Sequence, residues 1–249
     1  MSRHLPIRVA SGLAVIAYCA GSGLLQASEP ARPENAIQLV ADVQEAESRR
    51  DSDVRKIVST RRYVLKNDRW EKDAVMQVRI TWESGVGKQF EILSMENAEG
   101  LQKRVFHKLI EGEKEASRND WQMSDTDITA ENYSFDLIGT DRVLGRDCLV
   151  LKLKPKRNNK YLLEGKAWVD PKERAIIKVE GRTARSVSFW IGKPYIAQEF
   201  RKVGDMWMSA VNRSTSDVKL LGKTELCVQF LDYDIKRSGG SAIAHNTPK

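Results

Sequence analysis

One short stretch has the spacing of the aspartate nucleophile and acid of some phosphotransferases, namely Asp125-Thr126-Asp127-Ile128-Thr129. Such a pair uses one carboxylate to attack phosphorus and the second to transfer a proton. The motif should follow a continuous apolar strand, but residues 119–124 are mostly polar. Because Asp, Ser and Thr are common turn residues, we expect a loop here rather than a catalytic site.

Histidine is scarce, which removes most ordinary catalytic arrangements. Of the three histidines, His107 falls in an expected helix and His245 near the C-terminus. The sequence has no Gly-x-Ser-x-Gly turn, no zinc-ligand spacing and no glycine-rich phosphate loop. We therefore expect no catalytic residues, no metal and no cofactor, and we expect His107 to be solvated. A carboxylate pair with unrecognised chemistry stays open, because acidic residues are common and nothing singles out two of them.

The densest basic run is Lys152, Lys154, Lys156, Arg157 and Lys160. The simpler interpretation is a solvated hairpin tip. The alternative is a surface that meets anionic lipid headgroups or an acidic partner, because each nearby basic residue adds about 1 kcal/mol to such binding. We favour the simpler interpretation, and without interleaved aromatic residues we expect no nucleic-acid partner.

The N-terminal residues resemble an export signal. Arg3 and Arg8 precede an apolar run from Val9 to Ala20, and Ala27 offers a small residue for cleavage. The run is shorter than the roughly 18–20 residues that span a bilayer. We expect a signal peptide over residues 1–27, a single domain over 28–237 and a flexible tail over 238–249. The domain and tail together keep a modest excess of about five positive charges, interspersed with acidic residues.

Two segments have the periodicity of amphipathic helices. The first runs from Ala36 to Arg50, with Asn35 as a possible N-cap. The second runs from about Ala98 to Glu111, with Asn97 before it and Gly112 after it.

Most of the remaining chain alternates apolar and polar residues, as strands with one buried face do. Short glycine-containing connections favour an antiparallel meander. The predicted fold is α+β: one large curved antiparallel sheet, an incomplete barrel, with one or two helices on or over its concave face. Residues expected to share strand faces include Tyr133, Leu153, Val187, Ile191 and Leu226.

The hairpin YLLEGKAWVDPKERAIIKVEG, residues 161–181, is predicted to turn at Asp170-Pro171-Lys172-Glu173. One side would carry Leu163, Gly165, Ala167 and Val169, continued after the turn by Ala175, Ile177 and Val179. The other side would carry mostly charged residues together with Trp168. The apolar side is shallow at Gly165 and Ala167, so it should cover either a helix or a space for a ligand.

Residues 133–156, YSFDLIGTDRVLGRDCLVLKLKPK, followed by that hairpin, resemble the outer-membrane lipoprotein-sorting proteins related to the carrier LolA. The most telling pieces are Gly145-Arg146-Asp147-Cys148 and Trp168-Val169-Asp170-Pro171. The resemblance implies a periplasmic, non-enzymatic half-barrel that holds lipoprotein acyl chains or another lipid and meets a sorting partner in the inner or outer membrane. We expect a monomer. Two alternatives stay open: a periplasmic sensor that binds lipoproteins or a signalling partner, and an exported enzyme.

A ligand would lie on the large apolar residues of the concave face, which we expect to exceed what two short helices cover. The candidate set is Met76, Val78, Ile80, Trp82, Phe90, Ile92, Phe135, Leu137, Leu149, Leu151, Leu163, Ala167, Val169, Ile177, Val179, Phe189, Val228 and Phe230.

Two cysteines, Cys148 and Cys227, would lie in an oxidising compartment. In a meander several strands at about 4.8 Å spacing would separate them, whereas bridged Cα atoms lie within roughly 7 Å. We therefore expect two free thiols.

Overall fold

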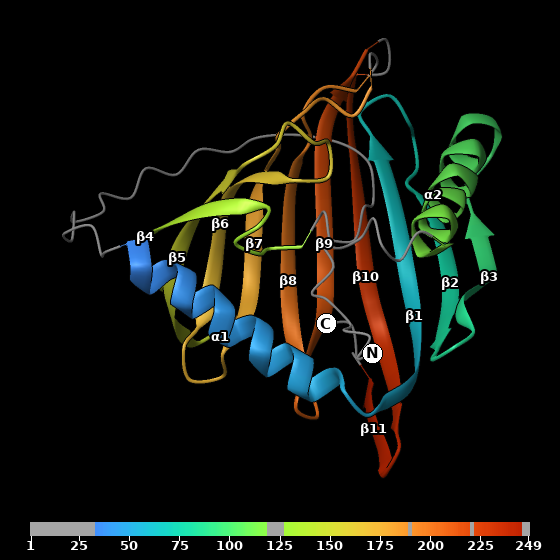
Figure 1. Cartoon of the computed structure of the whole chain (residues 1–249). Helices are drawn as coiled ribbons and strands as arrows, with labels where there is room; N and C mark the ends of the chain where they lie inside the picture. The colour runs from blue at the N-terminus through green and yellow to red at the C-terminus, as the bar shows by residue number, and fades with distance from the viewer. Residues whose placement is uncertain (1–32, 119–126, 189–190, 220–221, 246–249) are drawn as a thin grey trace.

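The structure is a computed structural model that describes residues 33–118, 127–188, 191–219 and 222–245 (Figure 1). Two helices accompany eleven strands in these residues, and all strands belong to one sheet. The helices are α1 (Pro33–Asp51) and α2 (Gly100–Arg118). The strands are β1 (Val54–Asn67), β2 (Ala74–Glu83), β3 (Gly87–Glu96), β4 (Tyr133–Val143), β5 (Arg146–Pro155), β6 (Leu163–Asp170), β7 (Ala175–Thr183), β8 (Tyr195–Val203), β9 (Met206–Val218), β10 (Gly222–Arg237) and β11 (Gly240–His245).

The sheet consists of two antiparallel meanders joined side by side. Its strand order is β3-β2-β1-β10-β9-β8-β7-β6-β5-β4, and β1 and β10 pair along most of their length. Among the described strands β3 and β4 are the two edges, so the sheet does not close on itself. Both helices lie on its concave side, with α1 across the β4–β9 half and α2 over β1–β3 (Figure 1). The predicted fold class, an incomplete antiparallel barrel with helices on its concave face, is confirmed.

Both helices are longer than the sequence pattern indicates. Helix α1 begins at Pro33, so Asn35 lies inside it rather than capping it, and proline suits a first helical turn because its missing N–H needs no partner there. Helix α2 continues past Gly112 to Arg118. A glycine in a helix costs only about 1 kcal/mol, and Glu113, just beyond it, bonds to the sheet.

Two further predictions differ from the structure, one in the β7–β8 connection and one at the C-terminal end of the sheet. The expected strand around Val187 and Ile191 is wrong, because these residues lie in the connection between β7 and β8, where Ile191 forms a single bridge to Val218. The expected tail from 238 contains β11, which pairs with β10 from Asp232 to Arg237. Strand β9 pairs with β10 only as far as Gln229, so the rest of that edge is open to β11.

Arg201 lies where β9 separates from β10. The Arg201 guanidinium donates to the carbonyl oxygens of Phe230 at 3.1 Å and of Leu231 at 3.3 Å. Backbone carbonyls that lose their strand partner are thereby satisfied, as buried polar groups require.

The two cysteines are free and buried, as expected. Cys148 lies in β5 and Cys227 in β10, with β6 to β9 between them in the sheet. Burial raises the pKa of both thiols, which keeps them in the less reactive protonated form.

Candidate functional site

The concave face carries two apolar clusters, one beneath each helix. The α2 cluster joins Phe106, Leu109 and Ile110 of α2 to buried residues of β1, β2 and β10. The α1 cluster joins Ala36, Val40 and Val43 of α1 to buried residues of β4–β8. Alternation along each strand places these side chains on one face.

Most of the predicted ligand-face residues lie in these two clusters. In or against the α2 cluster are Met76, Val78, Ile80, Trp82, Phe90, Val228 and Phe230. In or against the α1 cluster are Phe135, Leu137, Leu151, Leu163, Ala167, Val169 and Val179. Leu149 is half-buried and pairs with Val169 at the end of β5.

Besides Leu149, which belongs to neither cluster, three predicted residues do not join them. Ile177 is buried on the opposite, convex face with Cys148, Val150 and Trp168. A register shift between Trp168 and Val169 puts Ile176, rather than Ile177, on the concave side. Ile92 is exposed on the edge strand β3, where no strand covers its outer side. Phe189 lies outside the described residues.

The shallow patch in the β6–β7 hairpin has two separate causes. Gly165 faces Gly181 across the strand pair, and a Cβ on Gly165 would lie 2.0 Å from the Glu180 carbonyl oxygen. The glycines therefore permit close approach of the two backbones. Ala167 is fully buried in the α1 cluster. Side chains of the α1 cluster therefore surround the alanine.

The two hairpin segments that carry the resemblance, residues 145–148 and 168–171, are in contact in the structure. Arg146 Nη1 lies 2.8 Å from Asp170 Oδ2, and its guanidinium lies 4.8 Å from the Trp207 ring centroid. Asp170 also accepts the backbone N–H groups of Lys172 at 2.9 Å and Glu173 at 3.1 Å. Burial opposes ionisation of Asp170, but the bonds from Arg146 and the turn outweigh it, so its pKa is lowered. These residues hold the turn together.

An ion pair fixes α2 to the sheet. Arg61, on the concave face of β1, lies 2.9 Å from Glu113 of α2, and the Tyr63 hydroxyl donates to the same carboxylate at 2.8 Å. Arg61 and Glu113 keep only 13% and 12% of their side-chain surface exposed. Burial, the largest single influence, would lower the pKa of Arg61, but Glu113 together with Tyr63 and Tyr233 outweighs it, so that pKa is raised. Sequence analysis missed Arg61, although it shares its strand face with Tyr63 and Leu65.

A different arginine ties α1 to the sheet. Arg50, at the C-terminal end of α1, donates to the backbone carbonyl oxygens of Glu173 and Arg174 in the β6–β7 turn. This contact uses no buried carboxylate. The α1 side chains in its cluster are alanine and valine, whose burial contributes less per residue than that of Phe106, Leu109 and Ile110 of α2.

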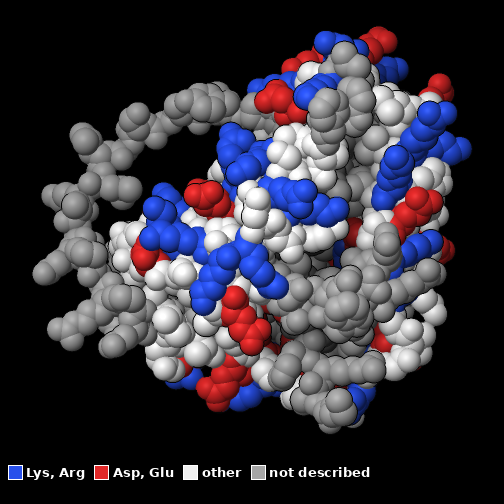
Figure 2. Space-filling view, turned by 45° about the horizontal axis from the view of Figure 1, so that its top comes forward, with Lys and Arg blue, Asp and Glu red and all other residues white. Residues whose placement is uncertain are grey.

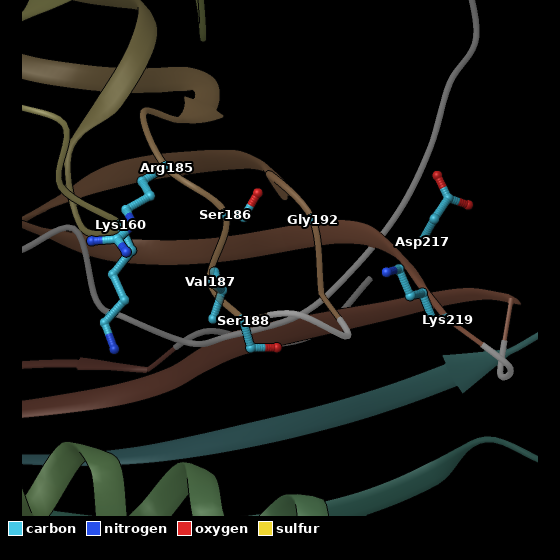
Figure 3. Close-up of a pocket in the computed structure, with 8 residues that line it drawn as sticks. All are labelled: Lys160, Arg185, Ser186, Val187, Ser188, Gly192, Asp217 and Lys219. Atoms are coloured by element: carbon cyan, nitrogen blue, oxygen red, sulfur yellow. The ribbon is translucent and has the colours of Figure 1, made fainter.

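A hollow of about 840 Å³ opens at the end of the sheet where β6 and β8 begin and β9 ends (Figure 3). Its lining comes from three connections: Lys160 before β6, Arg185–Ser188 and Gly192 between β7 and β8, and Asp217 and Lys219 at the end of β9. The sequence pattern does not predict this hollow, because the hollow forms where loops distant in the sequence meet.

The basic run divides into residues with different partners. Lys154 pairs with Asp136 at 2.5 Å, Lys156 donates to the Ala130 carbonyl at 2.6 Å, and Arg157 donates to Asn132. Lys160 instead lies over the Tyr161 ring and lines the hollow. Figure 2 shows basic side chains spread over one face of the molecule, with acidic ones between them.

The residues first considered for catalysis do not form a site in the described part of the chain. Asp127, Ile128 and Thr129 lie in a turn before β4, where the Asn132 side chain donates to the Asp127 carbonyl. Asp125 lies outside the described residues. His107 is exposed on α2, as expected. Within the described ranges no three His, Cys, Asp or Glu residues gather in a metal-binding group.

Comparisons with known proteins give matches at the level of structure. No protein family matches the sequence, and no curated protein matches it. An outer-membrane lipoprotein-sorting protein domain from Vibrio parahaemolyticus is similar at 12% identity and a TM-score of 0.46, covering 83% of this chain and 94% of that one. A DUF1329 family protein from Desulfovibrio piger is 12% identical with a TM-score of 0.44, covering 80% and 91%.

A LolA superfamily protein from Nitrosomonas europaea is 14% identical with a TM-score of 0.38, covering 80% of this chain and 92% of that one. The resemblance seen in the sequence is confirmed to this extent: similar solved structures include a lipoprotein-sorting domain and a LolA superfamily protein. Such distant similarity carries no argument about function. Neither described helix is long and apolar enough to cross a membrane.

Proposed function

We propose that the chain is a periplasmic, non-enzymatic protein that binds the acyl chain of a lipid or lipoprotein on its concave face and carries it between membranes. The observation that carries this proposal is the hollow of about 840 Å³ at the end of the sheet. Ligand sites of small molecules usually measure about 300–1,000 Å³. The hollow is the entrance, and the apolar strand residues of the two clusters are the surface on which the chain lies.

Helix α1 is the cover that gives way. Its side chains in the α1 cluster are Ala36, Val40 and Val43, and burial of side chains this small contributes roughly 5 kcal/mol in total. An acyl chain that buries ten methylenes gains about 8 kcal/mol at about 0.8 kcal/mol each. In terms of these apolar contributions, the acyl chain can replace the helix side chains.

Helix α2 stays in place in this proposal. It buries the larger side chains Phe106, Leu109 and Ile110, and its Glu113 pairs with Arg61. Its displacement would expose these larger apolar side chains to water and would also separate the Arg61–Glu113 pair.

Export supports the same function. The basic and apolar residues before Ala27 match a signal peptide, and a carrier of lipoproteins works between two membranes. Residues 28–237 form the binding domain in this proposal, which β11 extends to His245. The chain acts as a monomer and meets a sorting partner at either membrane.

Binding of monopalmitoylglycerol, measured by titration calorimetry, tests the proposal. The parent protein should bind it, and Val187→Trp, which fills the hollow, should weaken binding at least about tenfold. Val86→Trp is the matched control, because Val86 is exposed in the β2–β3 turn. No binding by the parent, or equal binding by Val187→Trp, would contradict the proposal. A protein partner that purifies with the chain in place of lipid would favour the sensor alternative.

A further inference from the structure

Three cations and one carboxylate line the hollow at the end of the sheet. The cations are Lys160, Arg185 and Lys219, and the carboxylate is Asp217 (Figure 3). Serine hydroxyls from the β7–β8 connection add hydrogen-bond donors to the same wall. The hollow therefore has an excess of positive charge, which the concave apolar face does not need for binding an acyl chain.

Two of these cations have no carboxylate within ion-pair distance among the described residues. Lys160 Nζ lies 4.9 Å from the centre of the Tyr161 ring, and Arg185 is exposed. Elsewhere on the molecule many basic residues have acidic partners, for example Lys154 with Asp136 and Lys202 with Glu173. Cations that face an open hollow without a carboxylate are available to an anion from outside.

The loop that carries Arg185 is fixed by its own hydrogen bonds. Val187 donates its N–H to Gly192 at 3.0 Å, and Ser188 donates its N–H to Ile191 at 3.1 Å. The Thr183 hydroxyl donates to the Arg185 carbonyl at 2.8 Å. Because the backbone is held on both sides of Arg185, binding does not have to order this part of the loop, which lowers its entropy cost.

Two lining residues of the hollow, Lys160 and Arg185, lie within two residues of the α1 cluster along the chain. Ala184 packs against that cluster and donates its N–H to the Leu162 carbonyl at 2.8 Å. Arg185 follows Ala184 in the chain, and Lys160 precedes fully buried Leu162 by two residues. A ligand with an anionic group here would have its apolar part beside the cluster.

We infer that the hollow binds the phosphate group of an anionic lipid, with Arg185 and Lys160 as its main ligands and the lipid acyl chain on the neighbouring apolar face. The inference rests on the proposed function. A guanidinium binds phosphate oxygens through two parallel N–H bonds, and an ammonium adds a point charge. The serine hydroxyl of Ser186 supplies a further donor. The site thus selects phosphate-bearing lipids over neutral ones.

Titration calorimetry with three probes tests this assignment. The probes are palmitoyl lysophosphatidic acid, monopalmitoylglycerol, which has the same chain without the phosphate, and inorganic phosphate. The parent should bind the phosphate lipid at least about tenfold tighter than the neutral one, and the difference should shrink at high salt. Lys160→Gln/Arg185→Gln should lose the difference and keep its affinity for the neutral lipid.

A matched control removes two charges from the convex face. Lys152 and Lys166 pair across β5 and β6 there, so Lys152→Gln/Lys166→Gln should behave as the parent does. Equal affinity of the parent for both lipids, or an unchanged preference in the pocket variant, would overturn the phosphate assignment while leaving acyl-chain binding intact.

The remaining outcomes separate the two proposals. If the parent binds inorganic phosphate as tightly as the phosphate lipid, the anion comes from solution and the lipid assignment is overturned. If the parent binds phosphate but neither lipid, the cations bind an anion and the acyl-chain proposal fails. If it binds none of the three probes, both fail.

Discussion

At the scale of single residues, two glycines illustrate opposite roles. Gly181 faces Gly165, and a Cβ on it would lie 2.4 Å from the Glu164 carbonyl oxygen. Gly112 lies in α2 with open space around its Cα. We expect Gly181→Ala to destabilise the fold by about 3 kcal/mol through overpacking, and Gly112→Ala to stabilise it by about 1 kcal/mol. Urea unfolding of both variants checks this, and a destabilised Gly112→Ala protein or an unaffected Gly181→Ala protein would contradict it.

A substitution at Ala167 tests whether a helix or a space lies over the β6–β7 hairpin. It is fully buried in the cluster beneath α1, so a tryptophan there must displace the helix or its neighbours. We expect Ala167→Trp to cost about 1–3 kcal/mol in unfolding free energy. Ala197→Trp is the control, because Ala197 is half-buried and pairs with Arg213 on the convex side. An unchanged melting temperature for Ala167→Trp would show an empty space over this residue.

Asp170 gives the fold a dependence on pH. Its pKa in the folded protein is lowered, so its ionised form stabilises the fold above the unfolded value of about 3.9. This contribution is lost as pH falls through the folded pKa. Asp170→Asn should therefore lower stability at pH 7, and the two unfolding free energies should converge toward pH 2. A constant difference between parent and variant from pH 7 to pH 2 would show that the charge of Asp170 is not responsible.

At the scale of elements, a largely buried ion pair connects β1 and α2. Glu113→Gln would leave the Arg61 guanidinium beneath the helix without its counter-charge, and we expect a cost of about 3 kcal/mol. Glu111→Gln, exposed on the same helix, should change stability by less than about 0.5 kcal/mol. The double variant Arg61→Leu/Glu113→Leu should recover most of the loss. Denaturant unfolding of the four proteins measures this, and equal effects of Glu113→Gln and Glu111→Gln would refute the attachment.

Sequence periodicity predicts elements well where one face is uniformly apolar, and less well elsewhere. The hairpin from Leu163 to Thr183 and both helices were foreseen, because their apolar residues recur at the right spacing. The face of Ile177 was wrong, since alternation cannot reveal a register shift between Trp168 and Val169. Strand β1 was not predicted, because Arg61 and other charged residues interrupt its apolar face.

At the scale of the whole molecule, the curved open sheet follows from the sequence, but its ligand surface does so only in part. Meander order and a concave apolar face were foreseen from short connections and alternation. The hollow near Lys160, Arg185 and Lys219 was not, because it depends on loops that meet only after folding. The pairing of β1 with β10 was not foreseen either, because it joins the two meanders across a long sequence separation.

The central claim is that the concave face binds an acyl chain. Mass spectrometry of the protein isolated from the periplasm of a double-membrane bacterium, without detergent, tests it most directly. The account predicts about one acyl-bearing lipid per protein chain, which is lost in Val187→Trp and retained in Val86→Trp. Protein that carries no acyl chains, and acquires none from membranes of the same cells, would contradict it.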